Sequence, residues 1–260
     1  LSSTEPNLQN IPVRTDLGAE IRKMFIPKPG CVLVDADYSQ IELRVLAHIA
    51  EDENMCAAFR NGLDIHTVTA SQVFAVPADE VTSLMRRHAK AVNFGIVYGI
   101  SEFSLSEDIG VTRWEARDYI ESYLANYRGV KAYMKKVVED ARECGYTRTM
   151  YGRRRPLPEL SSSNYNRRQF GERAAMNTPV QGAAADIIKI AMNAVRSRLE
   201  EEGLAAKLIL QVHDELIVEC PEGEQERVVQ LLRECMENAA QLRVPLIADV
   251  HAGRSWYDTK

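Results

Sequence analysis

Residues Val32 to Ile49 read VLVDADYSQIELRVLAHI and lead from a short apolar strand into an amphipathic helix. Small apolar residues alternate with Leu33, Asp35 and Asp37, and a period of two predicts a strand. Ser39 is expected to start the helix, which places Asp37 at the exit of a buried strand. The apolar stripe of this helix consists of Ile41, Val45, Leu46 and Ile49.

Two interpretations of the acids in this stretch are open. Ser39 and Glu42 have the spacing of a capping box, in which the Glu42 carboxylate accepts from the Ser39 backbone amide. Acids at strand ends and helix starts are also common turn chemistry, and on this interpretation neither acid needs a function. Alternatively Asp37 is half of a metal site, which requires a second carboxylate elsewhere in the chain.

Composition indicates a globular protein. The chain has 260 residues, 45% of them hydrophobic, and can bury the core of one large domain or two small ones. A net charge of -5 argues against nucleic-acid affinity of the whole surface, yet charge acts locally and the arginines cluster. The clusters are Arg86-Arg87, Arg153-Arg154-Arg155 and Arg167-Arg168.

Cysteine usage and the absence of targeting segments favour a reducing, cytoplasmic setting. The 5 cysteines are widely spaced and form no CxxC pair, which predicts neither a disulfide framework nor a zinc site. No signal-like segment and no apolar run near ~18 residues occurs, so neither secretion nor membrane spanning is expected. The chain begins LSSTEPNLQN without Met, and we expect it to be cut from something longer.

The first half of the chain is predicted to be an extended arm followed by the strand, its helix and further helices. The arm covers Leu1 to Pro29, with short strand pieces at Ile11–Val13 and Met24–Ile26. A helix opens at Asp64 and another at Pro77, with acids in the first turn. Further helices are predicted from Ser83 to Tyr98, from a capping box at Thr112 and Glu115 onward, and from Val130 to Glu143, the last of these ended by Gly145.

The second half is predicted to alternate helices with short strands. Tyr151–Arg168 is a basic loop, and the helix that starts at Glu172 is expected to break or kink at Pro179 before a long helix from Gln181 to Glu202. Lys207–Cys220 has the pattern of an antiparallel hairpin with His213-Asp214-Glu215 at its tip. A helix over Glu222–Leu242 and a strand over Pro245–Val250 follow. Early and late strands can share one antiparallel sheet, so the fold class is α+β.

The Ser83–Tyr98 helix carries an unusual face. Arg86, Lys90, Phe94 and Tyr98 recur every four residues and therefore lie along one side. Two cations followed by two aromatics suit a phosphate chain attached to a flat base, although a solvated basic end with a buried aromatic end explains the same pattern. Gly95 costs about 1 kcal/mol relative to Ala inside a helix, which indicates a close approach to the backbone.

Asp37 and Asp214 can supply the two carboxylates of a metal site. If their strands share one sheet, they become neighbours, and with the Tyr38 backbone carbonyl they offer the hard oxygen ligands that magnesium prefers. Two such ions activate an attacking hydroxyl and stabilise a leaving oxygen in phosphoryl displacement. Arg86 and Lys90 would neutralise the departing phosphates. The sheet would then carry the metals, and the helical insertion would carry the phosphate grip.

Five segments of the chain resemble the family A DNA polymerases of bacteria, in the order and with the spacing of that family. Three look like its polymerase motifs: DYSQIELR at 37–44, RRHAKAVNFGIVYG at 86–99 and QVHDE at 211–215. ERAAMNTPVQGAAADIIK at 172–189 and LSSTEPNLQNIP at 1–12 match as well. The resemblance runs from the first residue to the last.

The resemblance implies a palm formed by residues 1–52 and 151–260, interrupted by an all-helical fingers insertion over 53–150. By the family pattern Asp37, Asp214 and the Tyr38 carbonyl bind two Mg²⁺ ions. His66, Arg86 and Lys90 would hold the triphosphate of a dNTP, with Lys90 donating a proton to pyrophosphate. Phe94, Tyr98 and Gln40 would contact the nucleotide, and Glu42, paired with Tyr98, would exclude a ribose 2′-hydroxyl. Phe94, where relatives can have Tyr, implies discrimination against dideoxynucleotides. Arg173, Asn177, Gln181 and His213 would line the primer and template, and Glu215 would lie near the metals.

Several family features are not in this sequence. The arginine before LSST, the thumb and the exonuclease domains precede Leu1 in the family, and Asp35 is not a family ligand. Because phosphate contacts set most nucleic-acid affinity, the resemblance implies a monomeric fragment with an intact site and weak or distributive synthesis on primer–template DNA.

Three other functions fit parts of the pattern. A metal-dependent phosphohydrolase or nuclease would use the same carboxylates on water and release monophosphate rather than pyrophosphate. A binding-only fragment would grip nucleic acid through the basic clusters without turnover. A single-subunit RNA polymerase shares the palm, but Glu42 at the position that excludes ribose argues against it.

Overall fold

The computed structural model of the protein describes residues 5, 7–11 and 16–259. The chain divides into two compact units. Unit 1 comprises the described residues of 1–41, 184–241 and 246–260, and unit 2 comprises 42–183 and 242–245. Each is described separately. The predicted palm and fingers boundaries at residues 52 and 150 stay a prediction.

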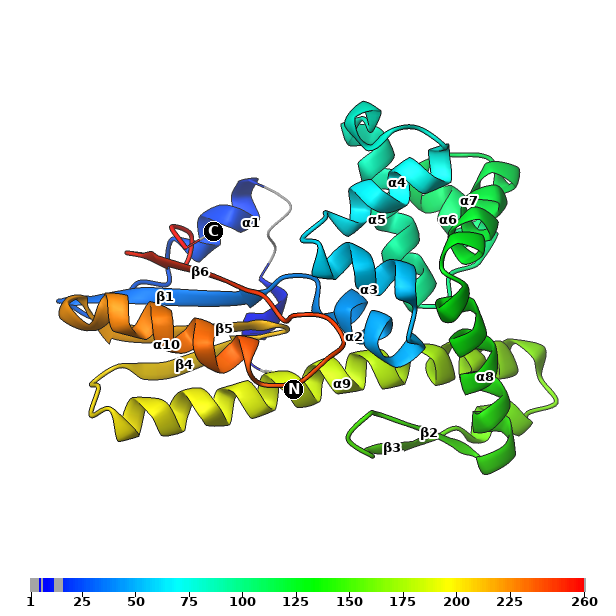
Figure 1. The fold of residues 1–260 in the computed structure, drawn as a ribbon. Helices are drawn as coiled ribbons and strands as arrows, with labels where there is room; N and C mark the ends of the chain where they lie inside the picture. Colours follow the sequence, from blue (N-terminus) through cyan, green and yellow to red (C-terminus); the bar gives the residue numbers. More distant parts are fainter. Residues whose placement is uncertain (1–4, 6, 12–15, 260) are drawn as a thin grey trace. The chain divides into compact units, whose positions relative to one another are not determined.

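Figure 1 labels the regular elements along the chain. The strands are β1 Cys31–Tyr38, β2 Tyr146–Arg148, β3 Arg154–Pro156, β4 Lys207–Val212, β5 Glu215–Pro221 and β6 Ala248–Gly253. The α-helices are α1 Asp16–Arg22, α2 Ile41–Ala50, α3 Glu53–Arg60, α4 Ile65–Phe74, α5 Ser83–Val97, α6 Glu102–Ile109, α7 Arg113–Asn126, α8 Arg128–Cys144, α9 Tyr165–Glu201 and α10 Gln225–Glu237. Short 3-10 helices are η1 Leu8–Asn10, η2 Ala78–Glu80, η3 Pro158–Ser161 and η4 Glu222–Glu224. None of the described helices is long and apolar enough to cross a membrane.

The core of unit 1 is an antiparallel sheet in the order β4-β5-β1-β6. β1 is therefore a central strand, and the predicted pairing of an early strand with late ones is confirmed, as is the α+β fold class. The strand is buried, as predicted: Leu33 and Asp35 are buried like Val34, because both faces of the sheet are covered. Helix α10 lies on one face of this sheet (Figure 1). There the Tyr38 hydroxyl donates to the Met236 carbonyl at 2.7 Å.

The opposite face of the sheet packs against the chain's two ends. Leu33 and Ile217 form a buried cluster with Trp256, and the Trp256 backbone N–H donates to the Phe25 carbonyl at 2.9 Å. The predicted strand at Met24–Ile26 is wrong, because this segment is an irregular connection after helix α1. The predicted strand piece at Ile11–Val13 falls largely outside the described residues.

Helix α9 runs through Pro179 without a break, so the predicted start of a separate long helix at Gln181 is wrong. Proline lacks the N–H that would bond the carbonyl of Ala175, four residues earlier. The Thr147 hydroxyl donates to this carbonyl instead, at 3.4 Å. A side chain from β2 thus satisfies the group that proline leaves without its helical partner.

Several other helix and strand boundaries differ from the predicted ones. The basic loop contains β3, which forms a hairpin with β2 from Tyr146↔Pro156 to Arg148↔Arg154, and α9 begins at Tyr165. The segment opening at Pro77 is a single 3-10 turn, the last helix ends at Glu237, and the last strand begins at Ala248. The β4–β5 hairpin, the capping box at Thr112 and the left-handed Gly145 after α8 are confirmed.

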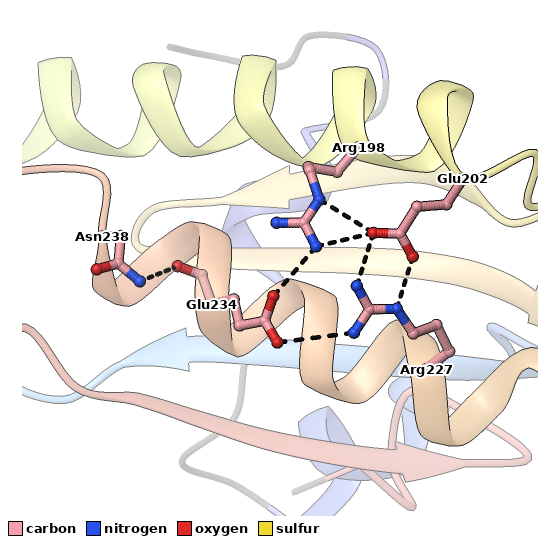
Figure 2. A network of polar contacts seen from close by, with 5 residues as sticks. All are labelled: Arg198, Glu202, Arg227, Glu234 and Asn238. Carbon is pink, nitrogen blue, oxygen red and sulfur yellow. Dashed lines mark hydrogen bonds and ion pairs between the residues drawn. The ribbon is translucent and has the colours of Figure 1, made fainter.

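An ion network joins α9 to α10 within unit 1, as Figure 2 shows. Glu202 accepts from Arg198 at 2.8 Å and from Arg227 at 2.6 Å, and Arg198 and Arg227 also reach Glu234. Hydrogen bonds from the two arginines lower the pKa of Glu202 to about 2 from an ordinary 4.5. The network stabilises the contact while Glu202 is ionised.

Replacing Glu202 with Gln is expected to lower stability most above pH 4.5. A carboxylate whose folded pKa is depressed contributes fully above its unfolded pKa and loses that contribution as pH falls toward the folded value, here about 2. The difference in urea midpoint between wild type and Glu202→Gln should therefore be largest at neutral pH and close toward pH 2. Glu200→Gln, which removes one i,i+4 pair with Arg196, is the control and should show a smaller difference. A difference independent of pH would contradict the prediction.

Candidate functional site

Three acids face one another across the sheet at the end of β1. Asp37 pairs with Glu215 of β5 on one side and with Asp249 of β6 on the other. Directly opposed residues of an antiparallel pair share a face, so these side chains project to the same side. The Tyr38 N–H donates to the Asp214 carbonyl at 3.2 Å, which brings Asp214 to the same end of the sheet.

This arrangement suits a hard divalent cation. Like charges opposed across strands destabilise a sheet, and a cation would relieve that repulsion. Among the described residues no group of three or more His, Cys, Asp or Glu has the geometry of a metal cage. Magnesium commonly binds through one or two carboxylates plus substrate phosphates, so Asp37, Asp214 and the Tyr38 carbonyl form a fitting donor set. The side chain of Tyr38 is turned toward α10 and leaves only its carbonyl for this role.

The C-terminal segment fixes the orientation of the Glu215 side chain. It is buried, and its Oε1 accepts from the Trp256 indole Nε1–H at 2.6 Å. Asp35, on the same face, accepts from the Thr259 hydroxyl at 3.1 Å. These contacts agree with the expectation that Asp35 is a structural acid, and they give Glu215 a partner that the sequence did not indicate.

Two residues near the acids have left-handed backbones. Gln40 (φ 56°) lies in the turn between β1 and α2, and His213 (φ 52°) lies in the β4–β5 turn. The exposed His213 ring contacts the Gln9 carbonyl through Nε2 at 3.0 Å. The Ser39 N–H donates to the Ile247 carbonyl at 2.9 Å and the helix begins at Ile41, so the predicted capping box of Ser39 and Glu42 is wrong.

In unit 2, the predicted face of α5 is accessible along its whole length. Arg86, Lys90 and Tyr98 are exposed and Phe94 is half-buried, whereas Ala89, Val92, Asn93 and Ile96 are buried on the opposite side. The alternative of a buried aromatic end is therefore not observed, since Tyr98 is 40% exposed. The Lys90 ammonium lies 5.9 Å from the Phe94 ring centroid.

Arg86 is held by an acid that the sequence identified only as a helix cap. Asp64 precedes α4 and accepts from Arg86 Nε at 2.6 Å and Nη2 at 3.2 Å. Burial raises the pKa of Asp64, but hydrogen bonds from Arg86 and Thr67 outweigh this effect and bring it to about 2. The guanidinium is thereby fixed in place at the N-terminus of α4.

His66 lies in the first turn of α4 and is 3% exposed. Burial lowers its pKa to about 4, with Asp64 acting in the opposite direction and Arg86 and Lys90 adding to the decrease. The ring is therefore neutral at neutral pH and lies among the charged groups of the α5 face. Its Nδ1 contacts the Asn93 amide nitrogen at 3.0 Å.

Glu42 and Tyr98 contact each other directly, although 56 residues separate them. The Tyr98 hydroxyl donates to Glu42 Oε2 at 3.1 Å. Burial raises the pKa of Glu42, and the bond from Tyr98 counteracts it. Glu42 thus presents a fixed, partly desolvated carboxylate beside an aromatic ring.

A cavity of about 570 Å³ opens beside the C-terminal end of α5 and is lined by Phe94, Tyr98, Ser104 and Arg173 among others. Gly95 is required there because a Cβ would lie 2.7 Å from Ile100 Cγ2, which explains the glycine inside the helix. Gly99 has φ +66°, and a Cβ at this position would lie 2.7 Å from Met176 Cε and 3.0 Å from Arg173 Cγ. Arg173 is exposed, and Asn177 and Gln181 are partly buried farther along the unit 2 portion of α9.

The structure therefore gathers the site residues into two sets. Asp37, Tyr38, Gln40, His213, Asp214 and Glu215 belong to unit 1, and Glu42, His66, Arg86, Lys90, Phe94, Tyr98, Arg173, Asn177 and Gln181 belong to unit 2. Sequence reasoning missed the partners Asp64, Asn93, Asp249 and Trp256. Of these four residues, only Asp64 could be recognised in the sequence, as the residue at which a helix begins.

Comparison with known proteins identifies close relatives. The sequence profile of DNA polymerase family A matches residues 1–258. The chain is 58% identical over 261 residues to DNA polymerase I of Geobacillus stearothermophilus and 57% identical to that of Bacillus subtilis (strain 168), in each case covering 100% of this chain and 30% of the relative. A solved structure, the POL domain of Pol1 from M. smegmatis in complex with DNA primer-template and dNTP, has a TM-score of 0.96 and 49% identity, covering 100% of this chain and 46% of that one. The chain thus spans less than half the length of these relatives.

Proposed function

Because the chain belongs to DNA polymerase family A, we propose that it carries the nucleotidyl-transfer site of a template-directed DNA polymerase. The observation that carries this proposal is the arrangement at the end of β1, where Asp37 pairs with Glu215 of β5 and Asp214 lies in the adjoining β4–β5 turn, its carbonyl accepting from the Tyr38 N–H. The M. smegmatis relative was solved with DNA primer-template and dNTP, and we propose the same classes of ligand for this chain. The reaction joins a dNTP to a primer 3′-hydroxyl and releases pyrophosphate.

Family A polymerases use divalent metal ions, and for this chain we propose two Mg²⁺ ions held by Asp37, Asp214 and the Tyr38 carbonyl. Bound there, a pair of ions lowers the pKa of the attacking hydroxyl and stabilises the leaving oxygen. The opposed acids of β1, β5 and β6 support this assignment, because they concentrate negative charge where a cation is needed. Glu215, tied to Trp256, would shape the charge around the ligands.

Arg86, Lys90 and His66 are proposed to hold the triphosphate. Arg86 and Lys90 supply positive charge, and neutral His66 supplies a hydrogen-bond donor. The Arg86 guanidinium donates to Asp64 in the structure. Phosphate oxygens would therefore either share the guanidinium with the Asp64 carboxylate or take its place. Lys90 would then donate a proton to the departing pyrophosphate, which avoids releasing a fully charged leaving group.

Phe94, Tyr98, Glu42 and Gln40 are proposed to select the nucleotide. The Glu42–Tyr98 hydrogen bond supports a role for Glu42 in excluding a ribose 2′-hydroxyl, since it fixes the carboxylate beside the ring against which a sugar would pack. Phe94 presents no hydroxyl at its position, and from this we expect discrimination against dideoxynucleotides.

Primer and template are proposed to contact Arg173, Asn177, Gln181 and His213. Arg173 supports this by its exposure and its place on the cavity beside α5.

We further propose that the protein acts as a monomer in the cytoplasm. The palm would comprise residues 1–52 and 151–260, and the fingers 53–150. Because the chain spans about 30% of its curated relatives, we expect weak or distributive synthesis by the chain alone.

Primer extension tests the proposed function. The 260-residue chain is incubated with a labelled primer–template, dNTPs and Mg²⁺ at low salt, alone and fused to the segment that precedes the matching region in the Geobacillus stearothermophilus relative. We expect extension by the fusion at least, with one pyrophosphate released per nucleotide added. Release of monophosphate would instead favour a phosphohydrolase, and DNA binding without extension in both forms would favour a binding-only fragment.

A further inference from the structure

A buried polar chain links His66 to the interior of unit 2. Asn93 on α5, Thr69 on α4 and Tyr127 at the end of α7 are all fully buried. The Thr69 hydroxyl donates to the Asn93 side-chain oxygen at 3.2 Å, and it also lies 3.2 Å from the Tyr127 hydroxyl. The Asn93 amide nitrogen lies 3.0 Å from His66 Nδ1. Four side chains from three helices thus form one continuous hydrogen-bonded line.

Which group donates in each of these hydrogen bonds follows from the protons that Tyr127, Thr69 and Asn93 carry. Burial raises the pKa of Tyr127 to about 12, so its hydroxyl keeps its proton. A buried phenol needs an acceptor for that proton, and Thr69 lies within reach. If Tyr127 donates to Thr69, the Thr69 proton goes to the Asn93 oxygen, which turns the Asn93 NH₂ group toward His66. Every proton on this path then has an acceptor.

We propose that Asn93 is a positioning residue for His66: its side-chain amide donates to Nδ1, so the imidazole carries its proton on Nε2. In a neutral histidine, the hydrogen bond made by one ring nitrogen determines whether the other ring nitrogen carries the proton. With Nδ1 accepting from Asn93, Nε2–H is a hydrogen-bond donor. The opposite tautomer would present a lone pair at Nε2, which repels an anionic oxygen.

The ligand of this donor follows from the charges around the ring and rests on the proposed function. Burial lowers the pKa of His66, and among the charges around the ring Asp64 raises this pKa while Arg86 and Lys90 lower it further. A neutral donor beside two cations can bind a phosphate oxygen without changing its own protonation state. The class of ligand is a nucleoside triphosphate, and Asn93, which never touches it, would act through His66.

The tautomer can be measured directly. In ¹⁵N-labelled protein, long-range ¹H–¹⁵N correlation spectra distinguish a protonated ring nitrogen from an unprotonated one, and comparison with His66→Gln assigns the signals of His66. We expect the Nε2–H form in the wild type at pH 7. The Nδ1–H form in the wild type would overturn the inference, whatever polymerase assays show.

Two variants test the role of Asn93. In Asn93→Asp a carboxylate replaces the donor, so Nδ1 should become protonated and the pKa of His66 should rise by about 1 unit or more. Asn54→Asp introduces the same charge at an exposed site of unit 2 and should change neither property. Thr69→Val removes the hydroxyl that orients Asn93 and should mix the tautomers, whereas Thr69→Ser should retain the wild-type form. An unchanged His66 in both Asn93→Asp and Thr69→Val would refute the proposal.

The kinetic readout uses the fusion described above. Loss of a hydrogen bond to a charged phosphate weakens binding by roughly tenfold or more, so Asn93→Asp should raise KM for dNTP by at least this factor. Thr69→Ser should leave KM unchanged. If the tautomer shifts as expected and KM does not, the positioning of His66 stands and its proposed phosphate ligand is wrong.

Discussion

Replacing Asp214 with Asn is expected to lower primer extension about 10³-fold or more. The substitution keeps the size of the side chain but removes the charge of a proposed metal ligand, and metal ions supply several kcal/mol of transition-state stabilisation. Each 1.36 kcal/mol corresponds to about a tenfold change in rate. Asp37→Asn should have an effect of the same order. Primer extension by the fusion protein under single-turnover conditions measures both.

The loss should not come from unfolding. Asp214 contributes its backbone carbonyl to the sheet by accepting from the Tyr38 N–H, and this bond does not depend on the side chain. Binding of Mn²⁺, followed by electron paramagnetic resonance, should weaken in Asp214→Asn while the circular dichroism spectrum stays unchanged. Asp79→Asn, at an exposed position in η2, is the control. Near wild-type extension by Asp214→Asn would exclude Asp214 as a ligand.

Replacing Trp256 with Ala is expected to lower the free energy of unfolding by about 3–5 kcal/mol. The indole is 1% exposed and lies edge-on to Phe25 with ring centroids 5.3 Å apart. The Arg22 guanidinium lies 4.2 Å from its ring centroid. Truncation would open a cavity between the sheet and the chain's two ends and would leave Glu215 without its indole donor. Urea denaturation at pH 7 measures the change.

Two further variants separate packing from the hydrogen bond. Trp256→Phe retains most of the ring but removes the N–H that bonds Glu215, and we expect a cost of about 1–3 kcal/mol from the buried carboxylate. Trp114→Ala removes the same side chain where it is 72% exposed, and should change stability by about 0.5 kcal/mol or less. Equal costs for Trp256→Ala and Trp114→Ala would show that the burial of Trp256 contributes nothing.

The sequence was sufficient wherever a structure depends on neighbours along the chain. The period of two predicted β1, and the period of four predicted the accessible face of α5 with Arg86 and Lys90 on it. The capping box at Thr112 and the left-handed Gly145 followed from residue types at fixed offsets. Family motifs added the pairing of Glu42 with Tyr98, which is also observed.

Tertiary structure decided what depends on residues far apart in sequence. Leu33 and Asp35 are buried because the C-terminal segment covers their face, and α9 continues through Pro179, where Thr147, 28 residues before Ala175, bonds the Ala175 carbonyl. The partners of Arg86, His66 and Glu215 are 22, 27 and 41 residues away. Periodicity fixes which way a side chain points along its own element, but a hydrogen bond needs a second element brought within about 3 Å. The residue types of the site were therefore determined by the sequence alone, whereas their charge states and orientations were decided by the fold.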